Sequence, residues 1–392
     1  MASPLDVGGP PDPRDALFRL LEDATREGVF PGCVALVWRD GATLYHEAHG
    51  MLASAPEVPE HAVSAARDTV YDLASLTKVL ATTTLWALTV SEGRVALDAP
   101  VPAPWSRACP GATLADLLEH CAGLTAHREY FLAHAGRPPG DVQRVLSDIL
   151  ATPPAYPPRR ESIYSDLGFI LLGAWLERVH ARPLDELFEN RVAWALGLEL
   201  RARPVPALGY HRLRPGGARG PARAQRSHVA PTEVYDPALH PGGVPSHFAV
   251  RRDLPYAHYE VHDDNALVMA GVAGHAGLFG DAEAVFEVAR AWLTATLPGL
   301  DARVRDRFWR PSTVPGSTRR LGWDGPGEGG SAGDAVSAGA VGHTGYTGTS
   351  LWIDPARQAI YVLLSNRVHP TRERAAIQRL RPRFHALASR IT

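Results

Sequence analysis

The stretch SLTKVLATTTLWALTV, residues 75–90, gives the clearest indication of the fold in this sequence. It is strongly apolar and is followed by Gly93, a residue typical of helix C-termini, so we predict a buried helix from Leu76 to about Val90. Ser75 and Lys78 stand three residues apart at its start, and residues at that spacing share one face of a helix. We therefore expect the serine hydroxyl and the lysine amine to lie together at the helix N-terminus.

Lys78 is the only lysine in the 392 residues, and every other Lys/Arg position carries arginine. Arginine keeps its proton near neutral pH, whereas lysine loses it when it is buried or placed near other charges. A serine hydroxyl is a poor nucleophile until a neighbouring base accepts its proton. The positive potential of a helix N-terminus disfavours the charged amine. Ser75 and Lys78 are therefore a candidate nucleophile and base.

The sequence before this helix predicts a helix followed by a β-hairpin. Apolar residues recur at helical spacing over residues 15–27, and CVALVW, residues 33–38, is typical of a strand. Asp40-Gly41 is a turn signal, so residues 43–49 are expected to return as the second strand.

The sequence after it predicts more helices, a long loop and a second hairpin. Residues 201–262 are rich in Arg, Pro, Gly and His, show no periodicity, and are expected to form an irregular loop over the body of the fold. The segment GVAGHAGLFG, residues 271–280, is expected to form a glycine-rich turn. Helices are predicted at 113–120 with Thr113 as N-cap, 142–150, 167–180, 184–196, 282–293 and about 372–388, and strands at 349–353 and 360–365.

This order of elements predicts an α+β fold. We expect an antiparallel sheet built from both ends of the chain, flanked by helices, with a mainly helical lobe between. Residues 1–13 are predicted to be a flexible N-terminus and residues 14–392 a single domain. Its sheet lobe would comprise about 14–70 and 270–392, and its helical lobe with the long loop about 71–269.

Three ordered motifs resemble the serine β-lactamases and penicillin-binding proteins, in particular their class C-like branch. Ser75-Leu76-Thr77-Lys78 corresponds to S-x-x-K, Tyr164-Ser165-Asp166 to Y-x-N, and His343-Thr344-Gly345, expected just before a strand, to K-T-G or H-T-G. Residues 117–124, LLEHCAGL, and 164–173, YSDLGFILLG, are similar to segments of that branch. The resemblance spans about residues 31–370 and implies the β-lactamase/transpeptidase-like fold.

The resemblance also implies roles for individual residues. Ser75 would be the acylated nucleophile and Lys78 its base partner. Tyr164 would be the phenol that passes the proton to the leaving group or, as a phenolate beside Lys78, helps to deprotonate Ser75. The backbone N–H groups of Ser75 and Tyr346 would form the oxyanion hole. The expected substrate-binding residues are Asp166, His343, Thr344, Gly345 and Tyr346. No metal or other cofactor is implied.

Two of these positions depart from the family pattern. Asp166 replaces the usual Asn, and an ionised carboxylate only accepts hydrogen bonds. It should hold Lys78 as an ammonium, shift more of the base role to Tyr164, and weaken recognition of a peptide-like acylamino group. His343 replaces the Lys of K-T-G; it is expected to be mostly neutral, able to donate a hydrogen bond but a weaker anchor for a substrate carboxylate.

The predicted activity is that of a serine hydrolase that acts through acyl-Ser75 on a small ester or amide. The alternatives are a DD-carboxypeptidase or β-lactamase-type peptidase acting on short peptides, an acyltransferase, and a non-catalytic binding protein that has retained the fold. A serine-reactive probe would separate the enzymes from the binding protein, and a panel of esters, D-amino-acid amides and a chromogenic cephalosporin would separate the enzymes from one another.

Composition argues against several other classes of function. The net charge of −2 shows no basic field for nucleic acid or anionic lipid. There is no signal-peptide pattern and no apolar run long enough for a membrane span, so a cytoplasmic location is expected. Cys33, Cys109 and Cys121 are expected to be reduced, with a Cys109–Cys121 disulfide as the alternative.

Three further groups of residues bear on the site: histidines, glycine-rich stretches and aromatic residues. His247, His258, His262 and His275 cluster in sequence but lack a fixed metal-ligand spacing, so structural roles are expected, with a metal site as the alternative. The glycine-rich stretches do not follow the pattern of dinucleotide-binding loops. The aromatic residues considered for lining a substrate cleft are Tyr130, Phe131, Tyr235 and Trp323.

Overall fold

The structure is a computed structural model that describes residues 12–53, 62–135, 137, 140–198, 207–213, 228–239, 243–250 and 256–392. Residues 1–11 of the predicted flexible N-terminus, and about half of the predicted 201–262 loop, lie outside the described residues. The part of the loop that is described includes β4 (Leu208–Tyr210), so the expectation of wholly irregular structure there is wrong.

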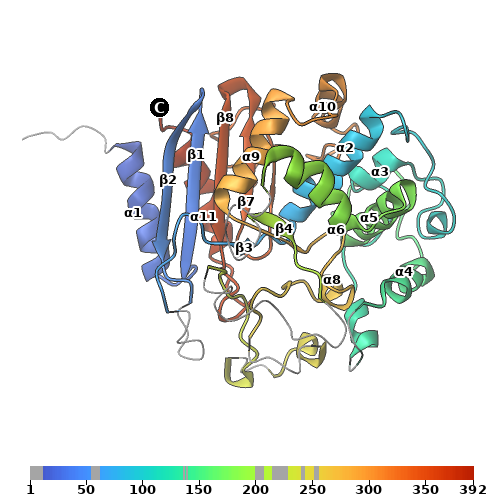
Figure 1. Cartoon of the computed structure of the whole chain (residues 1–392), viewed down its shortest axis with the longest axis horizontal. Helices are drawn as coiled ribbons and strands as arrows, with labels where there is room; N and C mark the ends of the chain where they lie inside the picture. The colour runs from blue at the N-terminus through green and yellow to red at the C-terminus, as the bar shows by residue number, and fades with distance from the viewer. Residues whose placement is uncertain are drawn as a thin grey trace, which may run out of the picture.

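A five-stranded antiparallel sheet with strand order β2-β1-β8-β7-β6 forms one side of the molecule (Figure 1). The first strand pairs with the last, from Cys33 opposite Ser365 to Arg39 opposite Ala359. The predicted sheet built from both chain ends is therefore confirmed. Its strands are β1 (Gly32–Arg39), β2 (Ala42–Gly50), β6 (Val341–Thr344), β7 (Ser350–Asp354) and β8 (Ala359–Ser365).

Side chains alternate between the two faces of this sheet, and each face packs into a separate apolar cluster. Val34 and Leu36 point to the larger cluster, shared with the helices of the middle of the chain. Cys33, Ala35 and Val37 point to a smaller cluster. This smaller cluster is covered by the first and last helices of the chain, α1 (Pro13–Arg26) and α11 (Ile377–Ala388).

Helices from the middle of the chain pack beyond the other face of the sheet (Figure 1). Most lie where the sequence predicts them, and Thr113 caps its helix in a reciprocal box with Asp116. Their bounds are η2 (Lys78–Thr83), α2 (Thr84–Ser91), η3 (Trp105–Arg107), α3 (Leu114–Leu118), η4 (Tyr130–His134), α4 (Val142–Ala151), α5 (Asp166–His180), α6 (Leu184–Phe188), η5 (Glu189–Ala193), η6 (Trp194–Leu196), η7 (Pro237–Leu239), η8 (Ser246–Val250), α8 (Asp264–Val268), α9 (Ala282–Thr294) and α10 (Ala302–Phe308). A further short helix, η9 (Pro355–Arg357), connects β7 to β8.

A second, three-stranded sheet was not predicted. It has the strand order β3-β5-β4. In it, β3 (Tyr71–Asp72) pairs with β5 (Leu278–Gly280), and the chain runs from β3 directly into the turn that carries Ser75. Two other expectations need correction. His343 and Thr344 precede β7 as predicted, but they themselves lie in a strand, β6, that was not predicted, and α11 begins at Ile377 rather than near residue 372.

The three cysteines are free and buried, so the expectation of reduced thiols is confirmed and the Cys109–Cys121 disulfide is wrong. Burial raises the pKa of the Cys109 and Cys121 thiols to about 12. Within the described part of the chain, no helix is both long and apolar enough to span a bilayer.

Candidate active site

Ser75 lies in a tight turn between β3 and the long apolar helix. The Asp72 carboxylate fixes this turn: its Oδ1 accepts the Ala74 N–H at 2.8 Å and its Oδ2 accepts the His262 N–H at 2.6 Å. Ala74 takes a left-handed φ of 47°, which a non-glycine residue adopts only when its surroundings enforce it. The turn therefore presents the Ser75 side chain from a fixed backbone.

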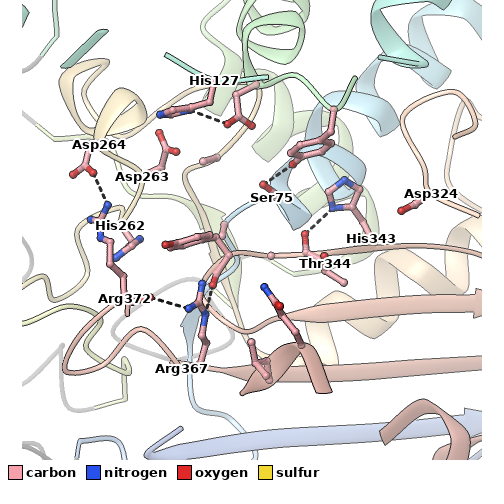
Figure 2. Close-up of a pocket in the computed structure, with 18 of the residues that line it drawn as sticks. Ser75, His127, His262, Asp263, Asp264, Asp324, His343, Thr344, Arg367 and Arg372 are labelled. Atoms are coloured by element: carbon pink, nitrogen blue, oxygen red, sulfur yellow. Dashed lines mark hydrogen bonds and ion pairs between the residues drawn. The ribbon is translucent and has the colours of Figure 1, made fainter. Parts of the chain in front are cut away.

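Three side chains converge on one another as the motifs predict. Ser75 Oγ lies 2.8 Å from the Tyr164 hydroxyl, which donates to it, and 3.0 Å from Lys78 Nζ (Figure 2). Lys78 is fully buried and also donates to the His275 carbonyl at 3.0 Å. Lys78 Nζ is 2.8 Å from Asp166 Oδ1. The nucleophile thus has two candidate proton acceptors within hydrogen-bond distance.

The helix that carries Lys78 is a π-helix over Lys78–Thr83 before it becomes α-helical, a feature the sequence did not reveal. Two contacts with the 271–280 segment hold it: the Lys78 amine donates to His275 O, and the Thr82 hydroxyl donates to Gly274 O at 2.6 Å. π-Helical turns are rare and are frequent at functional sites. Here the wider turn belongs to the segment that places the lysine under Ser75.

The charge on Lys78 is set by its neighbours. Burial disfavours the ammonium, but the negative charge of Asp166 and the hydrogen bonds with Asp166 and Tyr164 outweigh this, and the pKa of Lys78 lies above its ordinary value. Burial likewise opposes ionisation of Asp166, but the Lys78 charge and hydrogen bonds from His127 and Lys78 hold the pKa of that carboxyl well below its usual range. The resting site therefore contains a Lys78–Asp166 ion pair, as the sequence predicts.

Tyr164 is enclosed by cations and histidines. The Lys78 amine lies 4.9 Å from its ring centroid, and the Arg319 guanidinium lies 5.0 Å from it. The rings of His120 and His343 are at 4.7 and 5.6 Å. Burial raises the pKa of the Tyr164 phenol, and the Lys78 charge partly counters this. The phenol is therefore protonated in the resting site and ionises only if a change at Lys78 or the binding of substrate lowers its pKa.

His343 is buried and neutral. Burial and the charge of Arg319 hold its pKa well below the ordinary value. Its Nδ1 lies 2.8 Å from the Thr344 carbonyl, which can only accept, so the ring's single proton is on Nδ1 (Figure 2). Nε2 is buried and makes no hydrogen bond within the described residues. The ring therefore directs no N–H toward a substrate here, unlike the lysine of K-T-G.

Arg319 places a guanidinium beside Tyr164 and His343 that the sequence did not predict. It lines the cleft beside Tyr164 and His343 and forms an ion pair of 3.5 Å with Asp324. No motif marks Arg319, because it reaches the site from a loop between α10 and β6.

The segment after β6 is held close to the nucleophile. A Cβ atom at Gly345 would lie 2.6 Å from Leu73 O, so only glycine fits this approach. The buried Arg381 of α11 donates to the carbonyls of Gly345 and Thr349 at 2.6 and 2.9 Å. The backbone N–H groups of Ser75 and Tyr346 have no hydrogen-bond acceptor in the described part of the protein. They are thus free to bind a substrate oxygen.

These residues open onto a cleft of about 630 Å³. Of the four aromatic candidates, Phe131 lines it, whereas Trp323 is buried against Trp292, Tyr130 bonds to Thr152, and Tyr235 packs on Phe248. The predicted residues that line the cleft are Ser75, Tyr164, Asp166, His343, Thr344, Gly345 and Tyr346, with Lys78 buried beneath them.

The histidines considered as metal ligands have other partners. His247 and His262 contact the buried Glu233 at 3.1 and 3.3 Å, and His275 contacts Asp263 at 2.8 Å. His258 bonds to the Val229 carbonyl. No group of three or more potential ligands gathers among the residues that the structure describes, so these histidines have structural contacts.

Comparisons with known proteins agree with this geometry. Residues 17–383 match the family model described as Beta-lactamase. The chain is 29% identical over 391 residues to a protein of Salmonella gallinarum named "Putative D-alanyl-D-alanine carboxypeptidase", covering 94% of this chain and 86% of that protein.

Two solved structures illustrate the likeness in fold. SurE superposes with a TM-score of 0.65 at 25% identity, covering 97% of this chain and 75% of that one. EstCE1, described as a hydrolase with promiscuous acyltransferase activity, superposes with a TM-score of 0.69 at 20% identity, covering 96% and 97%. Because the family model covers most of the sequence, the chain belongs to the Beta-lactamase family and is a serine hydrolase of the β-lactamase/transpeptidase-like superfamily.

Proposed function

We propose that the protein hydrolyses a small ester or amide through a covalent acyl enzyme on Ser75. The observation that supports this most directly is the convergence of Tyr164 and Lys78 on Ser75 Oγ, at 2.8 and 3.0 Å. Such a hydroxyl can lose its proton as it attacks a carbonyl carbon.

The geometry suggests the order of proton transfers. Lys78 is held as an ammonium by Asp166, so the pair of Lys78 and Tyr164 must lose one proton before it can accept the one from Ser75. As the Ser75 Oγ–acyl bond forms, the carbonyl oxygen becomes negative and would be bound by the N–H groups of Ser75 and Tyr346. The proton then passes through the Tyr164 hydroxyl to the leaving alcohol or amine. In the second half of the reaction, water attacks the carbonyl carbon of the acyl-Ser75 ester, the Ser75 Oγ–acyl bond breaks as Ser75 regains a proton, and the acid is released.

The polar groups of the cleft favour a substrate without a peptide-like acylamino group. Asp166 offers only acceptor oxygens, and both are already paired with Lys78 and His127. The Nδ1–H of His343 already donates a hydrogen bond to the Thr344 carbonyl. A small ester needs neither contact, whereas a peptide would leave its own polar groups unpaired.

A carboxypeptidase activity is the second candidate, and Arg319 is the observation that favours it. Its guanidinium lies over the outer face of Tyr164 and lines the cleft, where it could pair with the carboxylate of a peptide C-terminus. The relative in Salmonella gallinarum carries the name of such an enzyme.

The test is intact-protein mass after mixing with p-nitrophenyl butyrate, together with the rate of nitrophenol release. Wild type is expected to gain one butyryl group and to turn over the ester; Ser75→Ala is expected to do neither. Ser147→Ala, on the exposed face of α4, is the matched control and should behave as wild type. A folded wild type that neither forms an adduct nor reacts with a phosphonate probe would contradict the proposal.

The same assay with an N-acyl-D-alanyl-D-alanine peptide separates the two candidates. Release of D-alanine at a kcat/KM above that of the ester, lost in Arg319→Gln, would favour the carboxypeptidase. Ester turnover with little peptide cleavage would favour the esterase.

A further inference from the structure

One cleft residue has no part in the acyl transfer described above. His127 lies between α3 and η4, and its side chain is 44% exposed. Its Nδ1 is 3.2 Å from Asp166 Oδ2 (Figure 2), while the other oxygen of the same carboxylate is 2.8 Å from Lys78 Nζ. A single carboxylate therefore bridges a buried lysine and an imidazole in contact with solvent.

Three carboxylates face the His127 ring from different elements. Asp166 comes from α5, Asp263 directly precedes α8, and Glu129 lies on the same segment as His127. The hydrogen bond with Asp166 is the main reason that the pKa of His127 lies above its ordinary value, and the charges of Asp263 and Glu129 act in the same direction. His127 thus keeps its proton to higher pH than an unperturbed histidine would.

His127 and Lys78 compete for the charge of Asp166. When His127 is protonated, part of the attraction that Asp166 exerts is satisfied by the imidazolium, and the Lys78 ammonium is held less firmly. When His127 is neutral, Asp166 acts on Lys78 alone. Because the coupling is reciprocal, a change at either cation must be felt at the other.

We propose that His127 is a positioning residue that controls, through Asp166, how readily Lys78 gives up its proton. This inference rests on the proposed acyl-enzyme function. A protonated His127 loosens the ion pair and keeps the Lys78–Tyr164 pair reactive at lower pH. Exposure lets His127 exchange protons with solvent, while Lys78 is fully buried.

The experiment is a pH profile of kcat/KM with p-nitrophenyl acetate, from about pH 5 to about pH 9, a range that brackets the titration of histidine. Wild type is compared with His127→Gln, which can still bond to Asp166 but adds no charge. The acidic limb reports loss of one proton from the Lys78–Tyr164 pair. Without the imidazolium this limb should move to higher pH by about one unit. In His127→Gln the rate on the acid side should therefore be roughly tenfold lower than in wild type, and this difference between the two proteins should become smaller as the pH rises.

Two further variants make the result specific. In the Asp166→Asn background the bridging charge is gone, so adding His127→Gln should change the profile less than about twofold at every pH. His228→Gln is the matched control, because His228 is exposed, does not line the cleft, and should leave the wild-type profile unchanged. A uniform rate loss in His127→Gln at all pH values, or the same limb shift in the Asp166→Asn background, would overturn the proposal.

A second readout does not depend on turnover. The His127 ring resonance, assigned by its loss in His127→Gln, should titrate at lower pH in Asp166→Asn than in wild type; an unchanged midpoint would also overturn the proposal. Ester turnover that survives in Ser75→Ala would instead refute the proposed function. Ser75-dependent turnover with an unmoved acidic limb would refute only the role of His127.

Discussion

At the scale of single residues, the presence of Asp166 where the Y-x-N motif has asparagine has the largest chemical consequence. An asparagine in a Y-x-N motif can donate to a substrate carbonyl and carries no charge. Asp166 has no donor and is negatively charged; it contacts Lys78 at 2.8 Å and His127 at 3.2 Å. In this protein the side chain at position 166 therefore pairs with Lys78 and His127 and offers no donor to a substrate.

Asp166→Asn should therefore change substrate preference. The amide regains a donor for the carbonyl of an acylamino group, so kcat/KM for a chromogenic cephalosporin, relative to that for p-nitrophenyl acetate, is expected to rise about tenfold, equivalent to one hydrogen bond of about 1.4 kcal/mol. Both rates are measured on the same preparation, so a general loss of activity cancels in the ratio. An unchanged ratio would show that Asp166 does not limit the use of acylamino substrates.

The sequence predicts only part of this site. Ser75 and Lys78 could be identified because three residues on a helix fix their relation, and Tyr164 because its motif begins a helix. Arg319 and His127 could not, because neither stands in a local pattern. They line the cleft from the loop before β6 and from the segment after α3, both far in sequence from Ser75 and Lys78. Their roles depend on tertiary contacts that single-sequence periodicity does not encode.

At the scale of elements, the close packing of α5 against the 271–280 segment helps to position Lys78. Gly274 lies so near α5 that a Cβ atom there would stand 2.1 Å from Phe169 O, and its own carbonyl accepts the Thr82 hydroxyl. The neighbouring His275 carbonyl accepts from Lys78. The glycine thus allows two backbone carbonyls to reach the π-helical turn.

Gly274→Ala is expected to force these elements apart. Overpacking of this kind costs about 1–3 kcal/mol of unfolding free energy, and displacement of His275 should also lower ester turnover by weakening the hold on Lys78. Urea unfolding and the ester assay measure the two effects. Gly339→Ala is the control, since a Cβ atom there meets nothing within 4 Å. Wild-type stability in Gly274→Ala would mean that α5 moves aside at little cost.

Element prediction from the sequence succeeded where periodicity is strong and failed where an element is short. The helices around residues 142–151 and 282–294 have clear apolar faces and were predicted nearly in full. β4 and β5 have three residues each, too few to show alternation, and β6 is buried with a glycine in it. Pairing with neighbouring strands, rather than local sequence, makes these segments extended.

At the scale of the whole molecule, neutral histidines are buried on both sides of the five-stranded sheet. His385 of α11 bonds to Ser350 beneath the sheet, and burial lowers its pKa to about 3. His120 and His343 lie on the cleft side, where burial first and the charge of Arg319 second hold their pKa values well below the ordinary one. The folded protein leaves all three uncharged where the unfolded chain would protonate them.

The protein should therefore lose stability in mild acid. Below the unfolded histidine pKa of about 6.5, each of these three side chains lowers the unfolding free energy by about 1.4 kcal/mol per pH unit, because the unfolded state binds a proton that the folded state does not. His127, with a raised pKa, acts in the opposite direction and offsets part of one such contribution. Between about pH 6.5 and about pH 5.5 these four histidines together should lower the unfolding free energy by about 3 kcal/mol, a large part of the stability of an ordinary domain.

Urea unfolding at about pH 7.5 and about pH 5.5, values on either side of the histidine pKa, measures this loss. His385→Gln, which removes one buried imidazole, should reduce the pH dependence by about one proton, whereas the exposed His228→Gln should leave it unchanged. Equal unfolding free energies at the two pH values would mean that the buried histidines are protonated in the folded protein. In that case His343 would be a cation beside Tyr164, and the site would resemble the lysine-bearing members of the family more closely than its hydrogen bonds indicate.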